Sequence, residues 1–137
     1  MSPADPIRVL IADDSPTALR SVCEYLEFAG GFEIVGTASD GQNAVQLIAL
    51  KKPDLVLLDL SMPRVNGLEA AVQIRLSSPD LRVIIFSELH GLSLADECRR
   101  HGADSFVAKN LLPEGLLLEI QRLFTRGRSK EAGAESH

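Results

Sequence analysis

Short apolar runs alternate along this chain with longer segments in which apolar residues recur every three or four positions. This alternation is typical of βαβ units, which build a parallel sheet because parallel strands need long crossovers. Two of the runs, 55–58 and 83–86, are apolar at every position, which predicts strands covered by helices on both faces. The predicted strands are 7–12, 33–38, 55–59, 82–87 and 105–108.

Helices are predicted in the segments between these strands. The first has Ser15 as its N-cap with Pro16 at the first helical position, and it ends at Gly30. The others are expected at about 41–52, 66–78, 92–101 and 113–126. Beyond residue 126 the apolar periodicity stops, so the sequence predicts one domain over 1–126 and a disordered tail or linker stub over 127–137.

Composition narrows the class of protein. The chain has 137 residues, 45% of them apolar, which suits one domain with a core that needs no disulfide or structural metal. A net charge of −5 argues against a nucleic-acid-binding surface. Cys23 and Cys98 are isolated from each other, as expected of reduced thiols. Because we find neither a leader pattern nor an apolar run long enough for a bilayer, we expect a soluble, cytoplasmic domain that does not contact membranes.

Charged side chains stand where several predicted strands end. Asp13 and Asp14 follow the first strand, Asp59 ends the third, and Lys109 follows the fifth. The carboxyl ends of parallel strands share one edge, where open α/β sheets bind ligands, so we expect these four side chains to meet there. Clustered carboxylates repel one another, and a hard cation relieves that repulsion. A site that offers only a few protein ligands and leaves room for water and a phosphate oxygen favours Mg²⁺ over Ca²⁺.

The same four side chains predict phosphoryl chemistry. Asp59 ends the central strand, and a carboxylate can act as the nucleophile that accepts a phosphoryl group. Lys109 supplies a positive charge for that group. Ser87, at the end of the fourth strand, offers a hydroxyl at the same edge to bond a phosphate oxygen.

In this order and spacing, these features resemble the response-regulator receiver domain of two-component signalling over about residues 7–124. The matching pieces are Asp13-Asp14, Asp-Leu-Ser-Met-Pro at 59–63, Asn66-Gly67, Ser87 and Phe-Val-Ala-Lys at 106–109. The resemblance implies an α/β fold, the flavodoxin-like doubly wound sheet of five parallel strands in the order 2-1-3-4-5, flanked by five helices.

The resemblance also implies a mechanism. Asp59 would take a phosphoryl group from the phosphohistidine of a sensor histidine kinase or phosphotransfer protein. Asp14, Asp59 and the backbone carbonyl of Ser61 would bind Mg²⁺ directly, and Asp13 would hold it through water. These assignments make a phosphoprotein of the domain and Mg²⁺ its cofactor.

Two residues would carry the signal away from the site. By the same resemblance Ser87 would move toward the phosphate, and Phe106 would turn inward as the switch aromatic. The face of the fourth helix, fifth strand and fifth helix would then change shape for a downstream partner or an output domain beyond residue 126. A homodimer through the fourth and fifth helices is expected from the family alone. The cognate kinase and the regulated process are not readable from the sequence.

Two positions depart from the family pattern, and two more leave one property open. Glu88 stands where the residue is usually small; beside the phosphate it would slow phosphorylation, and pointing outward it would not. Asn110 replaces a frequent proline, which predicts a trans bond after Lys109. Ser61 and Leu89 occupy positions that tune dephosphorylation, so the phosphate lifetime is left open.

Two other classes of protein are alternatives to a phosphorylatable receiver. A phosphatase with an aspartyl nucleophile normally has a second Asp two residues after the first, and here that position is Ser61. A receiver-like module that binds partners without phosphorylation commonly loses an acidic residue or the lysine, and this chain keeps all four. We therefore predict a phosphorylatable switch rather than a turnover enzyme, either standing alone or separated from an output domain.

Overall fold

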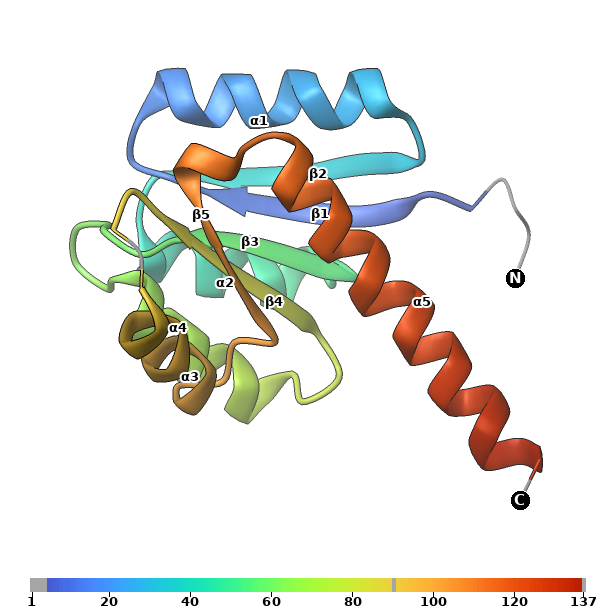
Figure 1. Cartoon of the computed structure of the whole chain (residues 1–137). Coiled ribbons are helices and arrows are strands. Elements are labelled where there is room, and N and C mark those ends of the chain that lie inside the picture. The colour runs from blue at the N-terminus through green and yellow to red at the C-terminus, as the bar shows by residue number, and fades with distance from the viewer. Residues whose placement is uncertain (1–4, 90, 137) are drawn as a thin grey trace.

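Five parallel strands form one sheet in the order β2-β1-β3-β4-β5 in the computed structural model, which describes residues 5–89 and 91–136 (Figure 1). The strands are β1 (Ile7–Ala12), β2 (Phe32–Ala38), β3 (Leu55–Asp59), β4 (Arg82–Ser87) and β5 (Ser105–Ala108). Strand number, order and direction are those that the sequence predicts, so the predicted fold class is confirmed.

Helices cover both faces of this sheet, with α1 and α5 on one face and α2, α3 and α4 on the other (Figure 1). A short 3₁₀ helix, η1, follows β5 and was not predicted from the sequence. The helices are α1 (Pro16–Ala29), α2 (Gly41–Lys51), α3 (Gly67–Ser77), α4 (Leu92–Arg100), η1 (Lys109–Leu111) and α5 (Glu114–Ser136).

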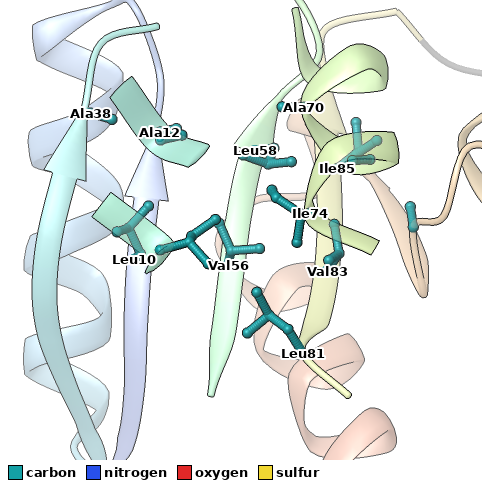
Figure 2. Packing of buried hydrophobic residues seen from close by; sticks show 14 of the residues in the cluster. Leu10, Ala12, Ala38, Val56, Leu58, Ala70, Ile74, Leu81, Val83 and Ile85 are labelled. Atoms are coloured by element: carbon teal, nitrogen blue, oxygen red, sulfur yellow. The ribbon is translucent and has the colours of Figure 1, made fainter. Parts of the chain in front are cut away.

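The two faces of the sheet hold two separate hydrophobic cores. Successive residues of a strand point to opposite faces, so Val56 and Leu58 pack under α2, α3 and α4 (Figure 2), while Leu55 and Leu57 pack under α1 and α5. All four side chains are inaccessible to solvent, and each contributes about 1.5–3 kcal/mol by burial. This double burial explains why the run before Asp59 is apolar at every position.

Polar N-caps start the three helices that follow strands β1, β2 and β3. Ser15 accepts a hydrogen bond from the Ala18 amide at the start of α1, and Asp40 accepts one from the Asn43 amide at the start of α2. Asn66 forms a capping box with Glu69 at the start of α3. These caps fix tight turns at the carboxyl edge of the sheet, where the predicted site lies.

The last helix is longer than the sequence predicts. The backbone of α5 continues to Ser136 and extends past the sheet (Figure 1); His137 lies outside the described residues. The segment contains no proline, and Lys130, Glu131 and Ala132 are strong helix formers, which suits a continued helix. The predicted disordered tail or linker stub over 127–137 stays a prediction. The predicted domain boundary at residue 126 stays a prediction. Across 5–89 and 91–136, no helix is both long and apolar enough to cross a membrane.

Candidate functional site

The register of the sheet places the predicted charged residues at one edge. Ala12 of β1 pairs with Leu58 of β3, so the next residues, Asp13 and Asp59, stand side by side at the carboxyl ends of their strands. Ser87 of β4 pairs with Ala108 of β5, so Lys109 comes directly after that pair. Strand pairing alone therefore brings the ends of four strands together.

Lys109 lies between the two buried carboxylates. Its Nζ is 3.1 Å from Asp13 Oδ2 and 3.4 Å from Asp59 Oδ1. The Lys109 Nζ also lies 5.1 Å from the centroid of the Phe86 ring. At this distance the ammonium is attracted to the π face of the ring. Asp14 is exposed, and one carboxylate oxygen from each of Asp13, Asp14 and Asp59 lies within 4.8 Å of the others.

Burial and crowding shift the pKa values of the central groups. Burial, followed by the neighbouring charge of Asp13, raises the pKa of Asp59 to about 6, although Lys109 opposes this rise. Burial alone lowers the pKa of Lys109, but its hydrogen bond to Asp13 and the charge of Asp59 outweigh it and raise that pKa. The ammonium stays protonated and is shared by two of the three converging carboxylates, so negative groups outnumber positive ones in the site.

The donor set fits a small hard divalent cation. Three carboxylates converge, two of them buried and one open to solvent, so an ion would have protein oxygens on one side and room for water or a phosphate oxygen on the other. Ser61 lies in the loop after β3, two residues beyond Asp59, with its side chain exposed. Its carbonyl as a fourth ligand stays a prediction.

Of the two predicted switch residues, Ser87 ends β4 at this edge, and Phe106 lies within β5. Ser87 is buried, and its hydroxyl accepts a 3.0 Å hydrogen bond from the Leu89 amide. Glu88 is exposed. Phe106 is half-buried and packs against the core under α2, α3 and α4. The cis peptide bond is at Leu112–Pro113, not after Lys109.

Two features of the site were missed from the sequence. Phe86 beneath Lys109 sits in a fully apolar run, so nothing distinguishes it from other core residues of β4. Arg64, in the loop after β3, pairs with Asp40 at a distance of 2.9 Å. Asp40 was interpreted only as a helix start, and a single arginine 24 residues away carries no local signal of this contact.

Comparison with known proteins identifies the family. Residues 9–121 match the family model of the response regulator receiver domain. That match covers most of the chain: it begins within β1, contains the other four strands, and includes the acidic residues and Lys109. The chain therefore belongs to the response regulator receiver domain family.

Relatives and solved structures agree with this assignment. The chain is 35% identical over 122 residues to the nitrate/nitrite response regulator protein NarL of Escherichia coli, covering 89% of this chain and 56% of NarL. It is 37% identical over 125 residues to the transcriptional regulatory protein PdtaR of Mycobacterium tuberculosis, covering 91% of this chain and 60% of PdtaR. The chain thus spans little more than half the length of these relatives.

The fold is similarly matched. The signal receiver domain of the putative response regulator NarL from Mycobacterium tuberculosis superposes with a TM-score of 0.82 at 28% identity, over 87% of this chain and 96% of that one. A CheX-CheY-BeF3-Mg complex from Borrelia burgdorferi gives 0.81 at 31% identity, over 87% and 90%. Receiver domains of this family are signalling switches of two-component systems, generally not turnover enzymes.

The raised pKa of Asp59 predicts a pH-dependent stability for the metal-free protein. Because this pKa lies above the ordinary value of 3.8, the folded state binds the proton more tightly than the unfolded state. The stability that Asp59 contributes is therefore present at low pH and is lost as pH rises from about 4 to about 6. Urea unfolding should show wild type losing on the order of 1 kcal/mol relative to Asp59→Asn between about pH 5 and about pH 7. A difference between the two proteins that is the same at both pH values would contradict this assignment.

Proposed function

We propose that this domain is the phosphorylatable receiver of a two-component phosphorelay, with Asp59 as the phosphoacceptor. The observation that carries the proposal is the convergence of Asp13, Asp14 and Asp59 with Lys109 at the carboxyl edge of the sheet. Burying two carboxylates around one ammonium costs stability. A receiver that had lost phosphorylation would have no function to offset this cost. A phosphorylation-independent binding module is therefore the less favoured reading.

The chemistry follows from the residues in place. An oxygen of the Asp59 carboxylate attacks phosphorus, the P–N bond of a donor phosphohistidine breaks, and the imidazole leaves as the donor's free side chain. The product on this chain is an aspartyl phosphate. Mg²⁺ held by Asp14, Asp59 and the Ser61 carbonyl, with Asp13 acting through water, would neutralise charge on the phosphoryl oxygens. Lys109 would turn from its two carboxylates to a phosphoryl oxygen.

A sensor histidine kinase or phosphotransfer protein is the proposed donor. An apolar cavity of about 270 Å³ lies between α1 and the start of α5, and its lining includes Tyr25, Leu112, Leu116 and Lys109 itself. A partner that packs on this apolar surface would stand next to Asp59. We place this exchange in the cytoplasm.

The proposed output runs through Ser87 and Phe106. The Ser87 hydroxyl, which accepts a hydrogen bond from the Leu89 amide, would donate its own O–H to a phosphate oxygen once Asp59 carries phosphate, and Phe106 would turn inward. The face formed by α4, β5 and α5 would then be altered for a downstream partner, an output domain or a second copy of the chain. The names of relatives include transcriptional regulators and a protein-glutamate methylesterase, and this chain covers 31% of the latter. Neither DNA binding nor turnover is proposed for the domain itself.

Intact-protein mass after incubation with acetyl phosphate and Mg²⁺ tests the acceptor. Wild type should gain one phosphoryl group, and it should lose that gain when the metal is chelated. Asp59→Asn should gain none, because the amide is not a nucleophile at this position. Circular dichroism of Asp59→Asn should match wild type, which shows that the fold is intact. Phosphate gained by Asp59→Asn at the wild-type rate would refute the acceptor assignment.

Glu88 should slow the reaction with small anionic donors. It is exposed directly after Ser87 and adds a negative charge at the edge that acetyl phosphate must approach. Glu88→Ala should therefore raise the rate of phosphorylation by about two- to fivefold at low salt, with a smaller gain at high salt because ions screen the charge. Glu27→Ala, which removes an exposed charge at the far end of α1, is the matched control. Equal rates for all three proteins would show that the Glu88 side chain points away from the donor.

A further inference from the structure

The loop over residues 60–66 connects the phosphoacceptor to α3, and both of its ends are fixed by backbone hydrogen bonds. The Leu60 amide donates to the Phe86 carbonyl at 2.9 Å, which ties the start of the loop to β4. The Gly67 amide donates to the Leu60 carbonyl, also at 2.9 Å, which closes the loop at its base. The proposed metal ligand Ser61 therefore lies in a closed loop whose ends cannot move apart.

Close backbone approaches at two glycines show how tightly this loop is seated. A Cβ atom on Gly67 would lie 2.6 Å from the Asp59 carbonyl oxygen, and one on Gly41 would lie 1.8 Å from the Val65 carbonyl oxygen. Any side chain at either position would collide with main chain. The loop is thus packed against the end of β3 on one side and the first turn of α2 on the other.

Arg64 ties the middle of the loop to α2. Its φ of 67° is left-handed, an unfavourable conformation for a residue with a side chain. Its NH1 atom lies 2.9 Å from Asp40 Oδ2. Asp40 is itself immobilised, because its side chain is only 9% exposed and its Oδ1 caps α2 through the Asn43 amide at 2.7 Å. Arg64 therefore binds a carboxylate that is already held in place. Such an ion pair is stronger than one with a freely moving side chain, because less side-chain entropy is lost when it forms.

We propose that Arg64, through its ion pair with Asp40, is a positioning residue that holds the 60–66 loop in the arrangement in which Asp59 and the Ser61 carbonyl bind a divalent cation. The inference rests on the proposed function. Ser61 is three residues before Arg64 in the same loop, so freeing Arg64 adds conformations that binding of the ion must remove. Residues that support metal ligands commonly affect metal affinity without touching the metal.

The sign of the effect separates positioning from simple electrostatics. Arg64 is positively charged and lies in the same loop as Ser61, whose carbonyl is the proposed metal ligand. The Arg64 side chain is 69% exposed. If it acted only through its charge, removing it would make Mg²⁺ bind more tightly. If it positions the loop, removing it makes Mg²⁺ bind more weakly. The two explanations therefore predict opposite changes in one measured constant.

Calorimetric titration with Mg²⁺ at fixed ionic strength tests the proposal. Arg64→Ala should raise the Mg²⁺ dissociation constant by about fivefold, and Arg64→Lys, which keeps the charge but not the planar fork, by less. Arg20→Ala removes an equal charge from an exposed site on α1 and should leave the constant unchanged. A dissociation constant for Arg64→Ala equal to or below that of wild type overturns the proposal.

A second set of measurements excludes a merely structural effect. Asp40→Asn keeps a good N-cap for α2 but removes the charge that Arg64 binds. In that background Arg64→Ala should add no further loss of Mg²⁺ affinity, because the two residues act as one pair. The rate of phosphorylation by acetyl phosphate should fall for Arg64→Ala at low Mg²⁺ and recover at saturating Mg²⁺. A loss that persists at saturating Mg²⁺, or additive losses in the double variant, would contradict positioning.

The wild-type titration distinguishes failure of this inference from failure of the proposed function. If wild type takes up neither Mg²⁺ nor phosphate, the proposed function and this inference fail together. If wild type binds Mg²⁺ and gains phosphate while Arg64→Ala binds Mg²⁺ equally well, only the role of Arg64 is refuted.

Discussion

The rest of the structure depends on the sharing of one ammonium by two buried carboxylates. Asp13 and Asp59 lie within 3.4 Å of Lys109 Nζ, and burial together with their mutual repulsion raises the pKa of Asp59. Such a cluster is under electrostatic stress, because one positive charge cannot balance two negative charges in a poorly solvated site. A divalent cation would relieve that stress, so the proposed metal-binding function would also stabilise the domain.

The surrounding architecture holds this stressed cluster in place. Two cores pack on opposite faces of β3, so the strand that ends in Asp59 is fixed from both sides. The register of β1 against β3 places Asp13 beside Asp59 with no contribution from the loops. The loops carry the other groups of the proposed site, namely exposed Asp14, the carbonyl of Ser61 and the Arg64–Asp40 pair. Strands thus set the buried charges, while the other proposed ligands lie on loops.

The sequence predicts the strands and the meeting of Asp13, Asp14, Asp59 and Lys109 at one sheet edge, and for a clear physical reason. Strands covered on both faces must be apolar throughout, as at 55–58, so the first charged residue after each marks the sheet edge. Contacts that depend on tertiary packing were not predictable. Arg64 meets Asp40 only because the loop crosses the start of α2, and Phe86 lies under Lys109 only because of the β4–β5 register. The length of α5 was underestimated because helix propensity carries it on after its apolar face has ended.

A crystal structure of the domain grown with Mg²⁺ and beryllium fluoride tests most directly whether Asp59 is the phosphoacceptor. We expect a beryllofluoride group attached to the carboxylate of Asp59, a metal ion held by Asp14 and Asp59, and Lys109 turned toward a fluoride. An Asp59 carboxylate that stays unmodified under conditions that saturate the protein with both ions, with Lys109 still bound to Asp13 and Asp59, would contradict this assignment. That result would make the cluster a structural ion-pair network instead of a phosphoryl-accepting site.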